Sequence, residues 1–431
     1  MQSMRPFWIV WTGQAFSLLG SQMVQFALVW WLTRTTGSAT VLAFATLMAL
    51  LPQILLSPFA GAIVDRQSRR RIMIVADAGI ALVTLVLIAC FWLNVASVWI
   101  VYAVLLVRSA GGAFHWPAMQ ASTILMVPQK HLSRVAGFNQ TLAGIASVFI
   151  PPLGAVAVEA LPMQTVLSVD VVTAAIAITP LFFIAIPQPV RTGSAAGTKT
   201  TMLADMREGL LYIVSWRGLL LFTILGTVIR LLGGAAGSLR PLLVTQRFGG
   251  GALEIGWLRS AEGIGAIIGG TLLGVWGGFR RRIVTMMLAL ILDGIVIAVA
   301  ALAPADAFLL AVGMIFAMGL LETIVMGTGG AAGQAIIPPE IQGRVFSLIS
   351  SAGFALAPVG LIVAGPVSDA LGVQFWWLIT GLVITAMGVF GLLVPDIVNI
   401  ESHAAEHTLA TPAPAGAPGP EPVAARTELP G

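Results

Sequence analysis

The sequence predicts an all-α integral membrane protein with about twelve transmembrane helices in two six-helix bundles. Of its 431 residues, 58% are hydrophobic and only 9% are charged, whereas soluble domains carry about 25% charged residues. Long apolar stretches recur along almost the whole chain, and each approaches the roughly 20 residues that cross a hydrocarbon core of about 30 Å. These stretches are too long and too uniformly apolar for the strands of a transmembrane barrel, whereas helices satisfy their own backbone hydrogen bonds in lipid.

Proline, glycine and charged residues divide the apolar stretches into helices of similar length in both halves of the chain. In the first half, residues 1–187, the expected helices span 7–33, 38–64, 72–93, 97–118, 135–159 and 164–187. In the second half, residues 217–396, they span 217–245, 253–278, 283–303, 306–334, 343–367 and 373–395. Each half is therefore expected to form one six-helix bundle.

Two segments outside the bundles differ in composition. The connector 188–216 opens with a stretch rich in Pro, Gly, Ser and Thr. Its second part, from Met202 to Tyr212, could form an amphipathic helix at the membrane surface. The tail 397–431 is rich in Ala, Pro, Gly and Glu and contains too few large apolar residues to fold. We expect the connector to be cytoplasmic and the tail to be disordered.

Basic residues are distributed asymmetrically between the connectors. They cluster on one side of the predicted helices, in the segments 66–71, 130–134, 191–207 and 280–282, whereas the opposite connectors contain little beyond Arg34 and Arg247. The positive-inside rule assigns the basic side to the cytoplasm, and an even number of helices places both termini there. Topology thus explains the net charge of +4 without a nucleic-acid partner. Arg greatly outnumbers Lys, which is typical of a high-GC genome and favours a bacterial source. We therefore expect the protein in a bacterial inner (plasma) membrane.

The two halves also resemble each other in sequence. The dipeptides at 127–128 (Val-Pro) and 134–135 (Arg-Val) recur 210 residues later at 337–338 (Ile-Pro) and 344–345 (Arg-Val). An internal repeat of six helices explains this recurrence. Parallel repeats are typical of secondary transporters, which bind their substrate near the bilayer midplane between the halves. The sequence therefore favours a small-molecule transporter that functions as a monomer.

The connector after the second predicted helix carries a family motif. Residues 61–71 read Gly-Ala-Ile-Val-Asp-Arg-Gln-Ser-Arg-Arg-Arg, which resembles the G-x-x-x-D-R-x-x-R-R-x signature of the major facilitator superfamily. A merely topological basic loop would explain the arginines but not the glycine and the aspartate, which can bring helices together and bind a helix N-terminus. The resemblance implies the major facilitator fold and a cytoplasmic gate made of Gly61, Asp65, Arg66, Arg69, Arg70 and Arg71. Asp77, one and a half turns further on, is expected to pair with these arginines.

Other segments resemble the macrolide-efflux branch of the drug:proton antiporters within that superfamily. They include residues 108–120 (Arg-Ser-Ala-Gly-Gly-Ala-Phe-His-Trp-Pro-Ala-Met-Gln), 36–39 and 343–347. The resemblance covers roughly residues 6–396 and implies export of small amphipathic molecules, driven by a cation gradient and most simply by proton antiport. Siderophores or metabolites are the alternative substrates within the same fold. Two positions depart from the superfamily pattern: 150–155 reads Ile-Pro-Pro-Leu-Gly-Ala instead of Gly-Pro-x-x-Gly-Gly, and Gly274 stands where an aspartate is expected.

Ionisable residues within the predicted helices are functional candidates, because a charge in hydrocarbon is costly. Proton coupling requires a carboxylate that binds and releases a proton near the working pH. Glu322 and Asp293 lie near the middle of their predicted helices, and Asp170 lies closer to the outer end. The alternative for each acid is a fixed ion pair with Arg108, in the fourth predicted helix, or with Arg230 in the seventh.

Four polar residues share one face of the first predicted helix at three- and four-residue spacing: Gln14, Ser17, Ser21 and Gln25. With Arg230 they are candidates to line a substrate cavity, and the alternative is hydrogen bonding between helices. Glu262 follows Arg259 by three residues, which favours a local ion pair. His115 precedes Trp116-Pro117, so we expect it to mark the end of the fourth helix.

Motifs for nucleotide hydrolysis and metal binding are absent from the sequence. It contains no G-x-x-x-x-G-K-[ST] loop and no H-E-x-x-H spacing, and its single cysteine, Cys90, cannot form an intramolecular disulfide or a Cys-based metal cluster. We therefore expect no enzymatic activity, cofactor or metal; the expected partners are a small-molecule substrate, protons and the lipid bilayer. A non-transporting receptor or channel is the alternative from another class, and the duplicated halves and intramembrane acids disfavour it.

Overall fold

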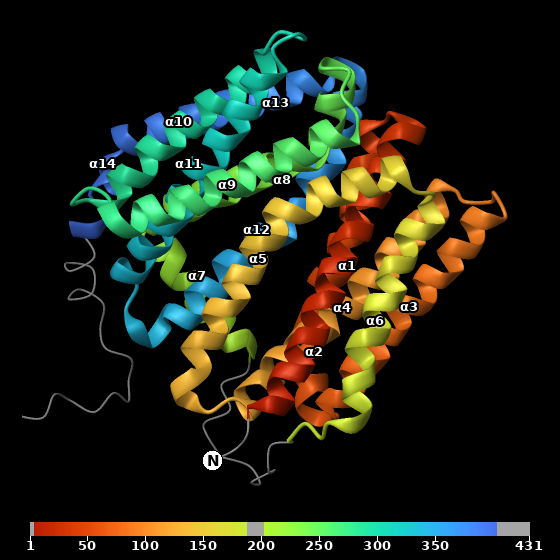
Figure 1. Ribbon diagram of the computed structural model, residues 1–431. Coiled ribbons are helices and arrows are strands. Elements are labelled where there is room, and N and C mark those ends of the chain that lie inside the picture. Colours follow the sequence, from red (N-terminus) through yellow and green to blue (C-terminus); the bar gives the residue numbers. More distant parts are fainter. Residues whose placement is uncertain (1–3, 188–201, 403–431) are drawn as a thin grey trace, which may run out of the picture.

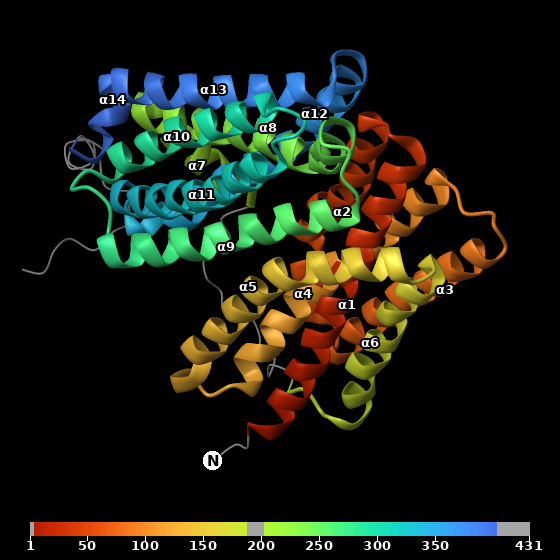
Figure 2. The same cartoon turned by 45° about the horizontal axis from the view of Figure 1, so that its top comes forward.

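The computed structural model of the chain describes residues 4–187 and 202–402, and the regular secondary structure in these ranges is entirely helical. The first bundle contains α1 (Arg5–Thr36), α2 (Ala39–Arg66), α3 (Arg69–Trp92), α4 (Val98–Met126), α5 (Gln129–Ala160) and α6 (Met163–Phe183). The second contains α8 (Arg217–Arg247), α9 (Ala252–Trp276), α10 (Arg282–Leu302), α11 (Phe308–Ile336), α12 (Pro339–Leu371) and α13 (Val373–Leu393). Figures 1 and 2 show the two bundles side by side, which confirms the predicted all-α architecture.

Eleven of the described helices are long and apolar enough to cross a membrane. The remaining predicted span, α9, has 25 residues, which is enough for about 37 Å at about 1.5 Å per residue. It carries Glu254, Arg259 and Glu262 together with several glycines, and these residues lower its hydropathy. α9 nevertheless packs along α11 and α5, so it occupies the place of the twelfth transmembrane helix.

The bundles meet mainly through two helix pairs, α2 with α12 and α5 with α9. At one end of the molecule Asp369, in the last turn of α12, accepts hydrogen bonds from the backbone N–H groups of Ala39 (2.6 Å) and Thr40 (3.0 Å) at the start of α2. The Ser38 hydroxyl donates to the same carboxylate at 2.9 Å. A carboxylate satisfies free N–H groups at a helix N-terminus and complements its positive dipole. The bundles are therefore held together at this end.

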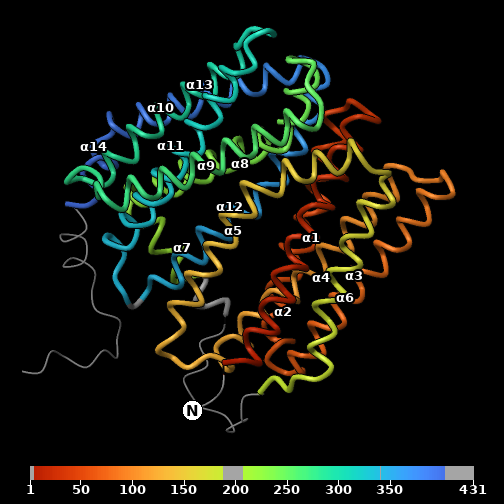
Figure 3. The backbone as a smooth tube through the Cα atoms, viewed as in Figure 1, coloured from red at the N-terminus to blue at the C-terminus, as the bar shows by residue number. Residues whose placement is uncertain are grey.

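The other end carries the connectors at 67–68 and 277–281, and we call it the arginine-rich end. Figures 1 and 3 show the helices of the two bundles diverging toward it. Asp65 and Arg66 are exposed there, and no atom lies within 4 Å of a Cβ placed on Gly61. The molecule is thus closed at the Asp369 end, and its bundles diverge toward the arginine-rich end (Figures 1 and 3).

The prediction that His115 ends the fourth helix is wrong. α4 continues to Met126, beyond the expected boundary at 118, and Pro117 lies inside it. Proline removes one backbone hydrogen bond, but a kinked helix is tolerated where neighbouring helices pack around it. The chain breaks instead at Pro128, which precedes α5, and the repeated Pro338 precedes α12 in the same way.

The segment between the bundles is described only in part. The helix α7 (Met202–Ser215) occupies the second part of the predicted connector and packs against α8 and α12. Glu208 of α7 pairs with Arg344 of α12 at 2.7 Å. The short helix α14 (Pro395–Val398) follows the second bundle. Residues 188–201 of the connector and 403–431 of the predicted tail lie outside the described residues.

Small residues let α9 and α11 pack closely. A Cβ on Gly265 would overlap the carbonyl oxygen of Phe316, and a Cβ on Gly319 would overlap that of Glu262. Small residues allow membrane helices to bring their backbones together in this way. The close packing also brings Glu262 and Glu322, one from each helix, into the walls of the same cavities.

Gly265→Ala should therefore lower the midpoint of thermal unfolding in detergent, because overpacking a tight contact costs about 1–3 kcal/mol. Gly274→Ala is the matched control on the same helix, since no atom lies within 4 Å of its Cβ position. Alanine in a helix is more stable than glycine by roughly 0.5–1 kcal/mol, so this variant should unfold at the wild-type midpoint or above it. Equal midpoints for the two variants would contradict the proposed packing.

Candidate functional site

A central cavity of about 800 Å³ lies between the two bundles. Its walls come from α1, α2, α5, α8, α9 and α11, and it combines apolar side chains such as Phe26 and Trp30 with a few polar ones. The charged residues in its wall are Arg259, Glu262 and Glu322. A largely apolar cavity with a few polar groups can hold a small amphipathic molecule.

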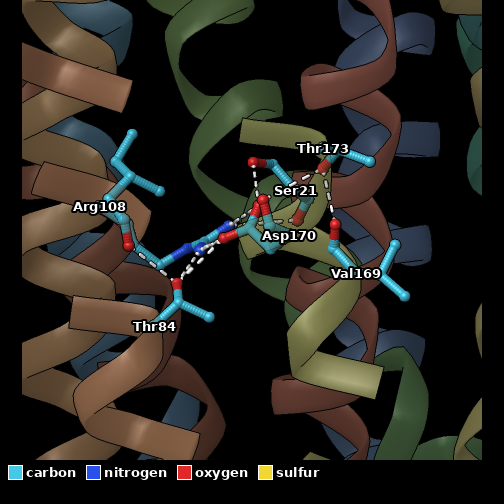
Figure 4. A network of polar contacts seen from close by, with 7 residues as sticks. Ser21, Thr84, Arg108, Val169, Asp170 and Thr173 are labelled. Atoms are coloured by element: carbon cyan, nitrogen blue, oxygen red, sulfur yellow. Dashed lines mark hydrogen bonds and ion pairs between the residues drawn. The ribbon is translucent and has the colours of Figure 1, made fainter. Parts of the chain in front are cut away.

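The first bundle contains a buried ion pair between Arg108 of α4 and Asp170 of α6 (Figure 4). The Ser21 hydroxyl donates to Asp170 Oδ1 at 2.7 Å, and the Thr84 hydroxyl donates to Asp170 Oδ2 at 3.0 Å. Arg108 Nη1 also donates to the Thr84 hydroxyl at 2.8 Å. Both charges are compensated, and helices α1, α3, α4 and α6 share the network. For Asp170, this geometry corresponds to the fixed ion pair that the sequence left as the alternative to proton coupling.

A second cavity, of about 340 Å³, extends into the first bundle. It is lined by all four polar residues predicted on one face of α1, namely Gln14, Ser17, Ser21 and Gln25. Two of them also bind neighbouring helices: Gln14 Nε2 donates to Asp77 Oδ2 at 3.0 Å, and Ser21 donates to Asp170. The polar face of α1 therefore both lines a cavity and fastens α1 to α3 and α6.

The expected pairing of Asp77 with the arginines at 69–71 is not present. Asp77 is buried, and its neighbours are Gln14 of α1 and His115 of α4, whose Nε2 lies 3.4 Å from Asp77 Oδ1. The sequence gives the distance along α3 but not the direction in which a side chain points. The Asp77 side chain points into the bundle, away from the exposed loop that carries the arginines.

The gate motif lies at the arginine-rich end, and two of its arginines bind their own bundle. Arg69 donates to the Ala121 carbonyl at 2.9 Å, and Arg70 donates to the Phe182 carbonyl at 2.7 Å. Asp65, Arg66 and Arg71 are exposed. In this conformation the motif does not close the space between the bundles.

The second bundle contains a charged cluster centred on Arg240 of α8, a residue that the sequence analysis missed. Arg240 is 2% exposed and forms a two-pronged ion pair with Glu262 of α9, in which Nη2 donates to Oε1 at 2.8 Å. Its guanidinium lies 5.8 Å from the centroid of the Trp377 ring. Arg259 lies 3.6 Å from the same carboxylate, so the expected local pair exists but is the longer one. In the sequence Arg240 is close to the expected helix end at 245, where a cation is unremarkable.

Asp293 and Glu322 lack the compensation that Asp170 and Glu262 have. Asp293 of α10 is 6% exposed, and its Oδ1 atom is buried without a hydrogen-bond partner among the described residues. Glu322 of α11 is exposed to the cavities, and within the described ranges it forms no hydrogen bond or ion pair. Both acids line a third cavity, of about 360 Å³, together with the predicted Arg230. No group of three or more potential metal ligands occurs in the described part of the chain.

Comparison with known proteins places this geometry in a family. The profile of the Major Facilitator Superfamily matches residues 10–358, which include the first bundle and most of the second. The chain belongs to the Major Facilitator Superfamily. It is therefore a multi-pass membrane transporter, as the motif at 61–71 predicted, and not an enzyme.

Relatives of similar length support the same assignment. Macrolide efflux protein A of Streptococcus pyogenes is 33% identical over 396 residues, which cover 92% of this chain and 97% of that protein. The multidrug efflux pump Tap of Mycolicibacterium fortuitum is 25% identical over 395 residues, which cover 89% of this chain and 94% of that protein. The predicted resemblance to the macrolide-efflux branch is thereby confirmed.

Solved structures share the fold at low sequence identity. A bacterial homologue of the iron transporter ferroportin, in an inward-facing state, aligns with a TM-score of 0.67 at 15% identity and covers 90% of this chain and 99% of its own. The nucleoside transporter NupG aligns with a TM-score of 0.62 at 12% identity, covering 88% and 97%. At these identities the comparison supports the fold alone.

The network around Arg108 gives a testable expectation for stability. Asp170→Asn should lower the thermal midpoint and the yield of folded protein, because removing one partner of a buried ion pair costs about 3–5 kcal/mol. Combining it with Arg108→Gln should recover much of that loss, since no uncompensated charge then remains.

The surface pair Arg217–Asp396 is the matched control, because its side chains are 80% and 39% exposed. Neutralising Asp396 should change stability by only about 0–1 kcal/mol. If Asp170→Asn and Asp396→Asn had equally small effects, the buried network would not stabilise the first bundle.

Proposed function

We propose that this transporter exports small amphipathic molecules of the macrolide type by proton antiport with alternating access. The relatives named as macrolide and multidrug efflux proteins support the direction of transport and the class of substrate. The observation that carries the mechanism is the contrast between the paired acids, Asp170 and Glu262, and the unpaired acids, Asp293 and Glu322. Only an acid without a fixed cation is free to exchange a proton for substrate.

The arrangement of the cavities explains how this exchange would work. Asp293 and Glu322 share the third cavity, and Glu322 also lines the central cavity. A carboxylate in a cavity that closes around it loses its water, which is costly unless the group binds a proton or a substrate compensates its charge. The transporter could therefore pass through the closed intermediate only with a proton or a substrate bound. This restriction would couple the two flows.

The orientation of the chain follows from its arginines. We assign the arginine-rich end to the cytoplasm of a bacterial cell, with both termini on that side. The conformation described here, in which the bundles diverge toward that end (Figures 1 and 3), would then be the one that receives substrate from the cytoplasm. A single chain contains both bundles and all three cavities, so we propose that the monomer is the functional unit.

The gate motif would act in the opposite conformation. α2 and α12 pack as neighbours of opposite direction, so each helix begins beside the end of the other. Asp369 caps the start of α2 at the closed end. We propose that Asp65, near the end of α2, caps the start of α12 when the arginine-rich end closes. Arg66 and Arg71, which are exposed in the present conformation, would become buried at the same time. The two caps would then alternate during transport.

Neutral substitutions separate the coupling acids from the structural acid. In proteoliposomes, Asp293→Asn or Glu322→Gln should abolish uphill efflux of a radiolabelled macrolide driven by a pH gradient, while downhill exchange continues. A neutral amide imitates the protonated acid, so the substrate can still cross but no longer exchanges with a proton.

Asp170→Asn is the control, and it should lower the detergent-extracted yield without removing the coupling of the molecules that fold. Full uphill efflux in all three variants would exclude proton coupling through these acids. If the wild type moved no macrolide but did move a siderophore or metabolite, the exporter would belong to the alternative substrate class.

A further inference from the structure

Asp77 and His115 form a polar pair in the first bundle that the proposed coupling through Asp293 and Glu322 does not use. Their side chains are 6% and 19% exposed, and His115 Nε2 lies 3.4 Å from Asp77 Oδ1. Gln14 Nε2 donates to the other carboxylate oxygen at 3.0 Å. All three residues line the cavity of about 340 Å³, so the pair is accessible to small ions and water.

Three of the helices near this pair, α1, α2 and α5, place no cation beside Asp77. α1 has no ionisable residue between Arg5 and Arg34, and α2 has none from 39 to 64. α5 contributes the neutral Asn139 to the cavity, and its basic residues lie in the first two turns at the arginine-rich end. Gln14 of α1 is the residue of these helices that binds Asp77, and it carries no charge.

The arginines of α3 and α4 are directed elsewhere. Arg69, two turns before Asp77, donates to the Ala121 carbonyl. Of the other arginines at the start of α3, Arg70 donates to the Phe182 carbonyl, and Arg71 is exposed. Arg108, about two turns before His115, is paired with Asp170 of α6. His115 is therefore the group through which the charge of Asp77 can be compensated.

We infer that Asp77 and His115 form a second proton-binding site, separate from Asp293 and Glu322. With a neutral imidazole the pair carries a net charge of −1, and with a protonated imidazole it carries none. A buried carboxylate without a cation is costly, so proton uptake by the pair relieves that cost. Imidazole is suited to this role because it ordinarily titrates at about pH 6.5. His115 Nε2 is buried without a hydrogen bond at 3.4 Å, and a modest approach to Asp77 would form one.

The position of the pair gives the site a consequence for transport. The cavity that holds it shares Gln22 and Gln25 with the central cavity. Protonation would therefore change the charge of the wall that the first bundle presents to a substrate. The proton-binding site itself exists whether or not Asp293 and Glu322 couple transport to protons.

Nuclear magnetic resonance of protein labelled with ¹⁵N-histidine tests this inference without a transport assay. The sequence contains four histidines. Comparison with His115→Gln and His131→Gln assigns the signals of these two residues, and His115→Asn replaces the first variant if it folds poorly. Spectra are recorded across the range from about pH 8 to about pH 5, in which imidazole groups commonly change charge, and in the wild type the His115 signals should show proton uptake by the imidazole. In Asp77→Asn the pH at which this change occurs should differ from that in the wild type, because the imidazole then faces a neutral amide instead of a carboxylate.

His131, near the start of α5, is the internal control, and its titration should be the same in the wild type and in Asp77→Asn. An imidazole at position 115 that stays neutral throughout the range would overturn the inference, since the pair would then be only a structural contact. An unchanged His115 titration in Asp77→Asn would overturn it as well. Neither result depends on whether the protein transports a macrolide.

Discussion

The cost of placing charge inside a membrane is the constraint on which the rest of this structure depends. A buried ion is tolerated when a partner of opposite charge compensates it. Arg108 with Asp170, and Arg240 with Glu262, meet this requirement and fasten helices within their own bundles. The acids outside this pattern are therefore informative, because a group that is kept without a fixed cation is free to bind a proton or a substrate.

Packing between the bundles places these charges beside a space that can open and close. Glycines bring α9 and α11 together and set Glu262 and Glu322 in common cavity walls. At the closed end, Asp369 of α12 caps the start of α2. Hydrogen bonds to a helix N-terminus are strong enough to hold two bundles and simple enough to break, since water can replace the carboxylate. This contact joins the two bundles at one end of the central cavity.

The fold was predictable from the sequence because lipid imposes length and hydropathy on every spanning helix, and the basic connectors fix their order across the membrane. α9 alone among the described helices of the two bundles lacks a sufficiently apolar stretch to be recognised as a membrane span, because Arg259, Glu262 and several glycines lie in it. The ion pairs between individual side chains were harder to predict. An arginine partner was one alternative for Asp170, and a local pair with Arg259 was the favoured interpretation for Glu262. Arg240 was nevertheless missed, and Asp77 was matched with the wrong residues. Position along a helix follows from the sequence, whereas the direction of a side chain depends on how helices cross.

The central claim is that substrate and proton compete for one set of acids. It is tested most directly by adding a macrolide to the purified wild-type protein in weakly buffered detergent solution and recording the pH. Substrate binding should release protons, and the release should disappear in a variant with both Asp293→Asn and Glu322→Gln. The measurement is made at about pH 6 to 8, because a coupling acid must exchange its proton near the working pH. If the wild-type protein binds the macrolide in this range without releasing a proton, the account is contradicted.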